Sequence, residues 1–186
     1  MTTQDPAPPN GLALVIDFVN TLDIEEETDA LADTREATAW LKQRGLLARG
    51  HADIGAQDRE RLISVREAIR QKLLANNGAE PNDDAARVLE RAARAGALGV
   101  RFHGDSASLA AGTAGFPGAL ANLLVPVARA MSDGTWRRMK ACRADDCEWA
   151  FYDRSRNRSG VWCDMAVCGN REKVRTYRRR GPSGRR

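Results

Sequence analysis

Four cysteines have types and spacing that suit metal chemistry, and all lie in the last third of the chain: Cys142, Cys147, Cys163 and Cys168. They form two pairs, with four residues inside each pair and fifteen residues between the pairs. A structural zinc site takes four thiolates in a closed tetrahedron, and two short-spaced pairs supply such a set. The spacing therefore predicts one structural zinc ion. A catalytic zinc ion would need a position open for water, which four thiolates do not leave.

The alternatives for the cysteines are two disulfides, or four thiols without a shared role. Disulfides persist in oxidising compartments, and the N-terminus lacks the basic start of a secretory signal. Residues 1–10 are polar and rich in proline, and the apolar stretch Leu12–Val19 is short and interrupted by Asp17. No uncharged run approaches the roughly 20 residues that span a bilayer. We therefore expect a cytoplasmic protein without membrane contact, in which the cysteines are reduced and bind zinc.

Charge divides the chain of 186 residues into two unequal parts. Residues 1–135 carry 14 basic and 19 acidic side chains, whereas residues 136–186 carry 15 basic and 6 acidic side chains. Four thiolates with one zinc ion add about −2 to the second part, which leaves it at roughly +7. This separation predicts an acidic body joined to a cationic module that binds a polyanion. A basic segment that is merely solvated is the alternative.

We expect one helix-rich domain followed by a small zinc module. The predicted division is a disordered N-terminus at residues 1–10, a helical domain at 11–135, a zinc finger at 136–180 and a disordered basic tail at 181–186. Apolar residues make up 42% of the chain, which is enough for a core in the larger domain. The finger has few apolar residues, so it should depend on its metal to fold.

Capping and periodicity predict four helices in the larger domain. They are a helix capped by Asp33 that ends at Gly45, one from about Asp58 to Asn76, one capped by Asn82 that ends at Gly96, and one from Pro117 to Met131 that Pro126 kinks or divides. Residues 12–22 form either a strand or a short helix, because so short an apolar run does not decide between them. Residues 98–102 and 106–110 predict a β-hairpin with its turn at 103–105.

Local patterns also predict the course of the finger. Residues 148–153 and 161–163 are rich in aromatic side chains and flank a polar loop, which predicts a second hairpin. Residues 164–180 contain no proline and one glycine, so they should be largely helical. A knuckle, a hairpin and a helix in this order resemble a treble-clef zinc site. The predicted fold class is α+β: a mostly helical N-terminal domain with a small β-hairpin, followed by a treble-clef-like zinc finger.

Basic residues of the finger are candidates for DNA binding, because guanidinium groups fit phosphate oxygens and guanine edges. The candidates are Arg171, Arg175, Arg178, Arg179 and Lys173 on the predicted helix, and Arg154, Arg156 and Arg158 in the loop. Helical spacing places residues 171, 175 and 179 on one stripe, with residue 178 beside it. Val174 and Tyr177 point the other way, and we expect them to pack on the protein. A solubilising surface is the alternative role for the basic residues.

Several motifs resemble those of a known bacterial family. The segment Cys168-Gly-Asn-Arg171, preceded by Trp162-Cys-Asp-Met-Ala-Val167 and Phe151-Tyr-Asp-Arg-Ser-Arg-Asn157, is similar to the CGNR zinc finger. Upstream, Leu14-Val-Ile-Asp-Phe-Val-Asn-Thr-Leu22, Trp40-Leu41 with Gly45-Leu-Leu47, and Val65-Arg-Glu-Ala-Ile-Arg70 resemble the ABATE domain that usually precedes that finger. The resemblance implies a stress-induced transcription regulator, in which a helix-rich sensor domain is joined to a DNA-binding finger.

Three polar residues inside apolar segments are candidates for ligand binding: Asp17, Asn20 and Arg66. In one interpretation they fix a small polar ligand in a pocket of the N-terminal domain. In the local alternative, Asp17 or Asn20 caps a helix and Arg66 pairs with a carboxylate. The two histidines, His51 and His103, belong to no catalytic pattern, so we expect no enzyme activity.

The sequence thus predicts a zinc-dependent, nucleoid-associated DNA-binding regulator whose N-terminal domain senses a ligand or partner. The alternative is a zinc-stabilised module that binds RNA or protein without reading a sequence. One small finger buries only about 600–1,000 Å² on DNA, so tight specific binding is expected to need a homodimer on a paired site.

Overall fold

A computed structural model describes residues 8, 9 and 11–180 of the chain. The ends for which the sequence predicts disorder, residues 1–10 and 181–186, lie outside this part except for residues 8 and 9. Helices dominate the described part, and its strands form two-stranded antiparallel sheets, which confirms the α+β class. None of the helices described is long and apolar enough to cross a membrane.

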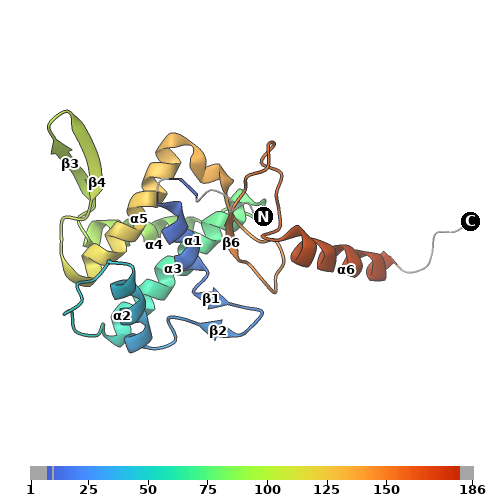
Figure 1. Ribbon diagram of the computed structural model, residues 1–186, viewed down its shortest axis with the longest axis horizontal. Helices are drawn as coiled ribbons and strands as arrows, with labels where there is room; N and C mark the ends of the chain where they lie inside the picture. The colour runs from blue at the N-terminus through green and yellow to red at the C-terminus, as the bar shows by residue number, and fades with distance from the viewer. Residues whose placement is uncertain (1–7, 10, 181–186) are drawn as a thin grey trace, which may run out of the picture.

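The helices of the N-terminal part are α1 (Leu12–Val19), α2 (Thr34–Gln43), α3 (Ala56–Asn76), α4 (Asp83–Ala95) and α5 (Gly115–Asp133). Two hairpins accompany them: β1 (Leu22–Asp23) with β2 (Thr28–Asp29), and β3 (Gly99–His103) with β4 (Ser106–Ala110). A 3₁₀ turn, η1 (Thr135–Arg138), leads to β5 (Met139–Ala141) and β6 (Ala150–Tyr152), and a π-helical turn, η2 (Met165–Gly169), leads to α6 (Asn170–Arg180). In Figure 1 the β3–β4 hairpin and α6 project from opposite ends of the helical body.

Local sequence signals predicted most helix starts correctly. Oδ1 of Asp33 accepts a hydrogen bond from the backbone N of Glu36 at 2.8 Å, and the side chain of Asn82 caps α4 in the same way. Residues 12–19, for which strand and helix were both open, form α1. Helix α5 runs through Pro126 as one helix, so the proline does not divide it. Apolar side chains are buried on every turn of α5, and this burial outweighs the hydrogen bond that proline removes.

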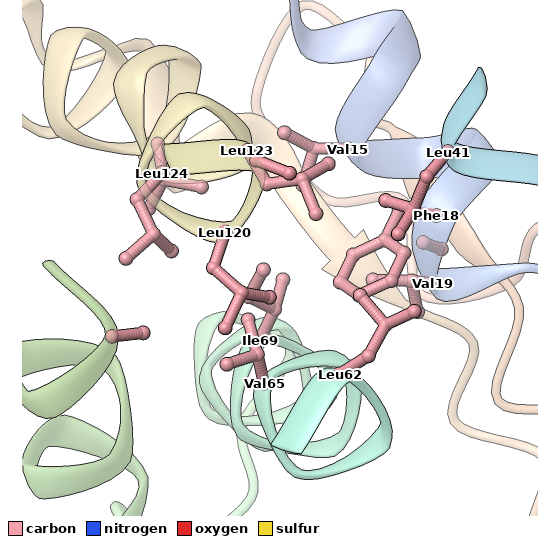
Figure 2. Close-up of a cluster of buried hydrophobic side chains, with 14 of the residues drawn as sticks. Val15, Phe18, Val19, Leu41, Leu62, Val65, Ile69, Leu120, Leu123 and Leu124 are labelled. Atoms are coloured by element: carbon pink, nitrogen blue, oxygen red, sulfur yellow. The ribbon is translucent and has the colours of Figure 1, made fainter. Parts of the chain in front are cut away.

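The hydrophobic core lies where α1, α3 and α5 meet, as Figure 2 shows. Phe18 of α1, Leu62 and Ile69 of α3, and Leu123 of α5 are fully buried there. The ring of Phe18 lies 5.4 Å from that of Trp40 in α2, measured between centroids, so α2 closes one side of the core. The apolar side chains along one side of α3 face this core: Leu62, Val65, Ile69 and Leu73.

The first strands of the finger belong to the same core. Met139 of β5 and Ala150 of β6 are buried in the cluster that the helices form, and β5 lies against α3. Strand β5 pairs antiparallel with β6, across the turn that contains the first cysteine pair. The predicted hairpin between residues 148–153 and 161–163 is therefore wrong. The turn at the first cysteine pair folds β6 back onto β5. Strand β6 therefore pairs with β5, whereas the prediction paired it with residues 161–163.

Candidate metal centre and its surroundings

The four cysteines converge beside β5, β6 and the start of α6. Their Sγ atoms all lie within 4.8 Å of one another. The Sγ of Cys163 is 3.6 Å from that of Cys147 and 3.7 Å from that of Cys168. A tetrahedral ion with zinc–sulfur bonds of about 2.3 Å has sulfur–sulfur edges of about 3.8 Å, so the cluster has the dimensions of a zinc site. None of these four cysteines forms a disulfide, and together they can hold one zinc ion, as predicted.

Short turns bring each cysteine pair together. The backbone N of Cys147 donates to the carbonyl oxygen of Ala144 at 2.9 Å and closes the first turn. The second turn is η2, where Oδ1 of Asp164 accepts from the backbone N of Ala166 at 2.6 Å. This cap starts the wide π-helical turn, which carries Cys168 back toward the cluster at the base of α6. Local backbone hydrogen bonds therefore help to bring the thiols together.

The glycine after the last cysteine is required by close packing. A Cβ atom at Gly169 would lie 3.1 Å from Cδ1 of Trp162 and would collide with the sulfur of Met165. The flexible thioether of Met165 can move, whereas the Trp162 ring packs against the cysteine cluster. The Gly of the Cys-Gly-Asn-Arg segment thus lets the indole approach the metal centre.

Hydrogen bonds inside the cluster decide which thiols are ionised in the absence of metal. Bonds from Cys147 and Cys163 stabilise the thiolate of Cys142 and lower its pKa to about 2. The bond to Cys142 raises the pKa of Cys147 to about 12, and the bonds to Cys142 and Cys147 raise the pKa of Cys163. Because zinc binds thiolates, metal binding must displace protons from Cys147 and Cys163.

Arg171, the last residue of the Cys-Gly-Asn-Arg segment, contacts the metal centre. Its Nη2 donates to Sγ of Cys168 at 3.4 Å, and its Nη1 donates to Oε1 of Glu25 at 2.7 Å. Oδ1 of Asp146 lies 3.5 Å from Nη2. The bond with Glu25 is the main cause that raises the pKa of Arg171, so its guanidinium remains charged beside the thiolates. Arg171 thus joins the cluster to the turn between β1 and β2.

Two further arginines of the predicted DNA-binding stripe also have partners within the protein. Nη2 of Arg175 lies 2.6 Å from Oδ2 of Asp146 in the first cysteine turn. Nη2 of Arg179 lies 3.3 Å from Oε1 of Glu172, which is about two turns earlier in α6. The stripe therefore lies toward the protein at Arg171 and Arg175, because acidic residues of the body and of the knuckle attract it there.

The opposite side of α6 points to solvent. Val174 is 48% exposed and Tyr177 is 78% exposed, so the expectation that these two side chains pack on the protein is wrong. Lys173 and Arg178 are exposed on the same side and form no ion pair with the described part of the chain. This orientation was not predictable from the sequence, because local patterns do not reveal which distant acidic groups meet the helix.

A buried ion pair supports the loop that contains the other predicted DNA contacts. Nζ of Lys140 in β5 donates to Oδ2 of Asp153 and to the carbonyl oxygens of Arg158 and Gly160, each at 2.7 Å. Burial opposes ionisation of Asp153, but bonds from Lys140 and Ser155 outweigh it and lower the pKa of Asp153. The loop held in this way exposes the side chains of Arg154, Arg156 and Arg158.

Polar side chains of the helical body hold β6 and the first cysteine turn. The side-chain amide of Asn20, at the end of α1, forms the two backbone hydrogen bonds that an adjacent strand would form. Its Nδ2 donates to O of Ala150 at 3.1 Å, and its Oδ1 accepts from N of Ala150 at 2.7 Å. Arg70 of α3 is 1% exposed and donates to the carbonyl oxygens of Val19 and Glu148, each at 2.8 Å. The end of α1 is thereby fixed to the segment that follows Cys147.

The C-terminal end of α3 makes a second connection to the finger. Nδ2 of Asn77 donates to the carbonyl oxygens of Ala141 at 2.7 Å and of Val161 at 2.9 Å. Nδ2 of Asn76 donates to the carbonyl oxygen of Met139 at 2.9 Å. Sequence reasoning missed these roles, as it missed those of Arg70, Lys140 and Asp153. The available signal was a polar side chain inside an apolar run, which Lys140 shows between Met139 and Ala141.

The three candidate ligand-binding residues have different protein partners. Oδ2 of Asp17 lies 3.2 Å from Nη2 of Arg44 at the surface, whereas Asn20 binds the backbone of β6. Nη1 of Arg66, a buried residue, lies 2.7 Å from Oδ1 of Asp29. The local alternative, in which Arg66 pairs with a carboxylate, is confirmed. Ligand binding by these residues stays a prediction.

Two family models match the chain. The model described as "CGNR zinc finger" matches residues 138–181 and covers all four cysteines. The ABATE model, described as "Putative stress-induced transcription regulator", matches residues 12–133, which is more than half of the chain. No curated protein matches the chain. The two matches follow one another in the order that the sequence motifs indicate.

Proposed function

Because this chain belongs to the ABATE family and carries a CGNR zinc finger, we propose that it is a zinc-dependent transcription regulator that binds DNA through the finger. The zinc ion has a structural role: four thiolates enclose it and hold β5, β6 and α6 together. The helical body has a regulatory role, and the chain has no catalytic activity of its own.

The observation that supports DNA as the partner is the placement of positive charge. Residues 136–186 carry 15 basic and 6 acidic side chains, against 14 and 19 in the rest of the chain. The exposed basic side chains of the described finger include Arg154, Arg156 and Arg158 in the loop and Lys173 and Arg178 on α6. A concentrated cationic surface on a metal-stabilised scaffold attracts a polyanion and holds it in a defined orientation.

The contacts between the helical body and the finger support regulation. Arg70 and Asn20 bind the backbone on both sides of Trp149, directly after the first cysteine turn. A ligand or stress-linked partner that shifts α1 or α3 therefore changes the position of the cysteine turn. We expect a coupling free energy of about 1–3 kcal/mol between such an event and DNA binding.

A salt titration of the full-length, zinc-loaded protein on duplex DNA tests the proposed function. Each phosphate contact should contribute about −0.9 to the slope of log affinity against log salt concentration, so several contacts give a steep negative slope. Binding that does not change with salt, or no binding at low salt, would overturn DNA as the partner.

Selection of bound genomic fragments then separates sequence-specific regulation from the alternative. Recovery of one recurrent sequence supports a regulator. Uniform recovery, or equal affinity for RNA, supports a zinc-stabilised module that binds nucleic acid without reading a sequence. Because one finger buries only about 600–1,000 Å² on DNA, the recurrent sequence is expected to be a paired site occupied by a homodimer.

A further inference from the structure

One side of α6 makes few polar contacts within the described part of the protein: Nδ2 of Asn170 donates to the carbonyl oxygen of Ala166 at 3.0 Å, and the other side chains on this side have no hydrogen bond or ion pair there. Its residues recur at intervals of three and four positions from the first, in the pattern i, i+3, i+4, i+7, i+8, so they share one helical face. They are Asn170, Lys173, Val174, Tyr177 and Arg178. All five are exposed, and Tyr177 is 78% exposed. We call these five residues the outer face of α6. In Figure 1 the helix extends away from the helical body, which leaves room for a large partner beside it.

The other side of the helix is already occupied. Arg171 contacts Glu25 and the thiolate of Cys168, and Arg175 contacts Asp146. A phosphate group that approached these guanidinium groups would compete with carboxylates that already lie 2.6–2.7 Å from them. The outer face needs no such rearrangement. Its Lys173 and Arg178 are exposed cations without an ion-pair partner in the described part of the chain.

The residue types on the outer face are those that contact the edges of DNA bases, whereas a face that only meets water has no need of exposed apolar side chains. Arginine and lysine bind guanine, asparagine binds adenine, and apolar groups contact the thymine methyl. The outer face offers all three kinds, with Val174 and Tyr177 as its apolar groups. A helix about 10–12 Å across also fits the major groove, which is about 12 Å wide.

We propose that the outer face of α6 enters the major groove of duplex DNA, and that Arg171 and Arg175 hold the helix against the protein instead of contacting DNA. This assignment rests on the proposed function, that the finger binds DNA. It replaces the stripe of residues 171, 175 and 179, which sequence periodicity favours, with the opposite side of the same helix.

Two adjacent arginines give a matched test. Arg178 belongs to the outer face, whereas Arg179 lies about 100° further round the helix and pairs with Glu172. Arg178→Ala and Arg179→Ala remove the same charge from neighbouring positions, and neither side chain is buried. We expect Arg178→Ala to weaken binding of full-length, zinc-loaded protein to its selected duplex roughly tenfold or more. Arg179→Ala should change the affinity less than about twofold.

Tyr177→Ala tests the apolar part of the outer face without changing charge. We expect weaker binding with an unchanged salt slope, because no phosphate contact is lost. Tyr177→Phe keeps the ring and should bind nearly as tightly as the wild type. Circular dichroism and zinc content should be unchanged in all four variants, since these side chains lie outside the core and the metal site.

Methylation protection of guanine N7, an atom that lies in the major groove, gives an independent measurement. The wild type should protect N7 within its site, and Arg178→Ala should lose part of that protection. Equal losses of affinity for Arg178→Ala and Arg179→Ala, or wild-type affinity for Tyr177→Ala, would overturn this inference while leaving DNA binding intact. Failure of the wild-type protein to bind duplex DNA at low salt would overturn the proposed function and this inference with it.

Discussion

Arg171 and Glu25 form an ion pair of 2.7 Å although 146 positions separate them in the sequence. The other end of the Arg171 guanidinium contacts Sγ of Cys168. The contact therefore joins the metal centre to the turn between β1 and β2 in the N-terminal part of the chain. Through these two contacts, Arg171 has a structural role that differs from DNA binding.

Replacing Arg171 by lysine tests the role of this contact. Lysine has a single ammonium group, so Arg171→Lys cannot reach Glu25 and Cys168 together. We expect the variant to bind zinc roughly tenfold more weakly than the wild type in competition with a chelator. Loss of a residue that hydrogen-bonds to a metal ligand has an effect of this size in other metalloproteins. Glu25→Gln is the control, because it keeps the bond to sulfur. It should cost at most about 1 kcal/mol of unfolding free energy and hold zinc normally.

Zinc itself should stabilise more than the finger. Purified, reduced protein is expected to contain one zinc ion per chain by elemental analysis. Because Met139 and Ala150 lie in the core of the helices, chelation or Cys168→Ser should lower the thermal stability of the whole chain. Thermal melting followed by the helical circular dichroism signal measures this effect. A melting curve that chelation leaves unchanged would contradict it.

Zinc binding should release protons and weaken as the pH falls. Cys147 and Cys163, whose pKa values are raised, are protonated near pH 7, whereas Cys142 is ionised there. Zinc must displace the first two protons, so the apparent affinity rises with pH and falls on acidification. A pH-indicator dye in weakly buffered apo-protein should report proton release when zinc is added. Zinc binding without a change of dye signal would contradict the assignment.

The buried pair of Lys140 and Asp153 should be sensitive to the loss of one partner. Lys140→Met leaves the Asp153 carboxylate buried and unpaired, which should cost about 3–5 kcal/mol of unfolding free energy in urea titrations. The double variant with Asp153→Asn should recover part of that loss. A full additive loss in the double variant would show that the two side chains act independently.

Acid should remove the contribution of Asp153. The folded state lowers the pKa of Asp153, so this contribution is fully present above the unfolded value of about 3.9 and is lost as the pH falls through the lower folded value. Urea titrations of the wild type and Asp153→Asn at several pH values measure it. The stability difference between the two proteins should shrink at the acidic end.

Asn20 and Asp17 separate structural from ligand-binding roles in α1. Asn20→Ala removes two hydrogen bonds to the backbone of β6 and should cost about 1–3 kcal/mol of unfolding free energy. Asp17→Ala removes a surface ion pair and should cost less than about 1 kcal/mol. Similar small losses in both variants would leave Asn20 free for the ligand-binding role that the sequence suggests.

The parts of the structure that local sequence determines were predictable. Asp33 and Asn82 cap their helices through backbone groups two or three residues away, and the cysteine spacing defines the metal site. The strand pairing of the finger was not predictable, because β5 and residues 161–163 are both possible partners for β6 and local sequence does not choose between them. The orientation of α6 was not predictable either, because Glu25 and Asp146 approach it from other parts of the chain.

The connection between α3 and the finger limits how this protein can be recombined. A chimera that transplants residues 138–180 onto another body would expose Met139 and Ala150 and would leave behind Asn77, which binds the backbone of Ala141. A graft that also carries the last turns of α3 would preserve these contacts. The unit that can be transferred to another protein is therefore longer than the zinc-binding segment, and its two parts are not adjacent in the sequence.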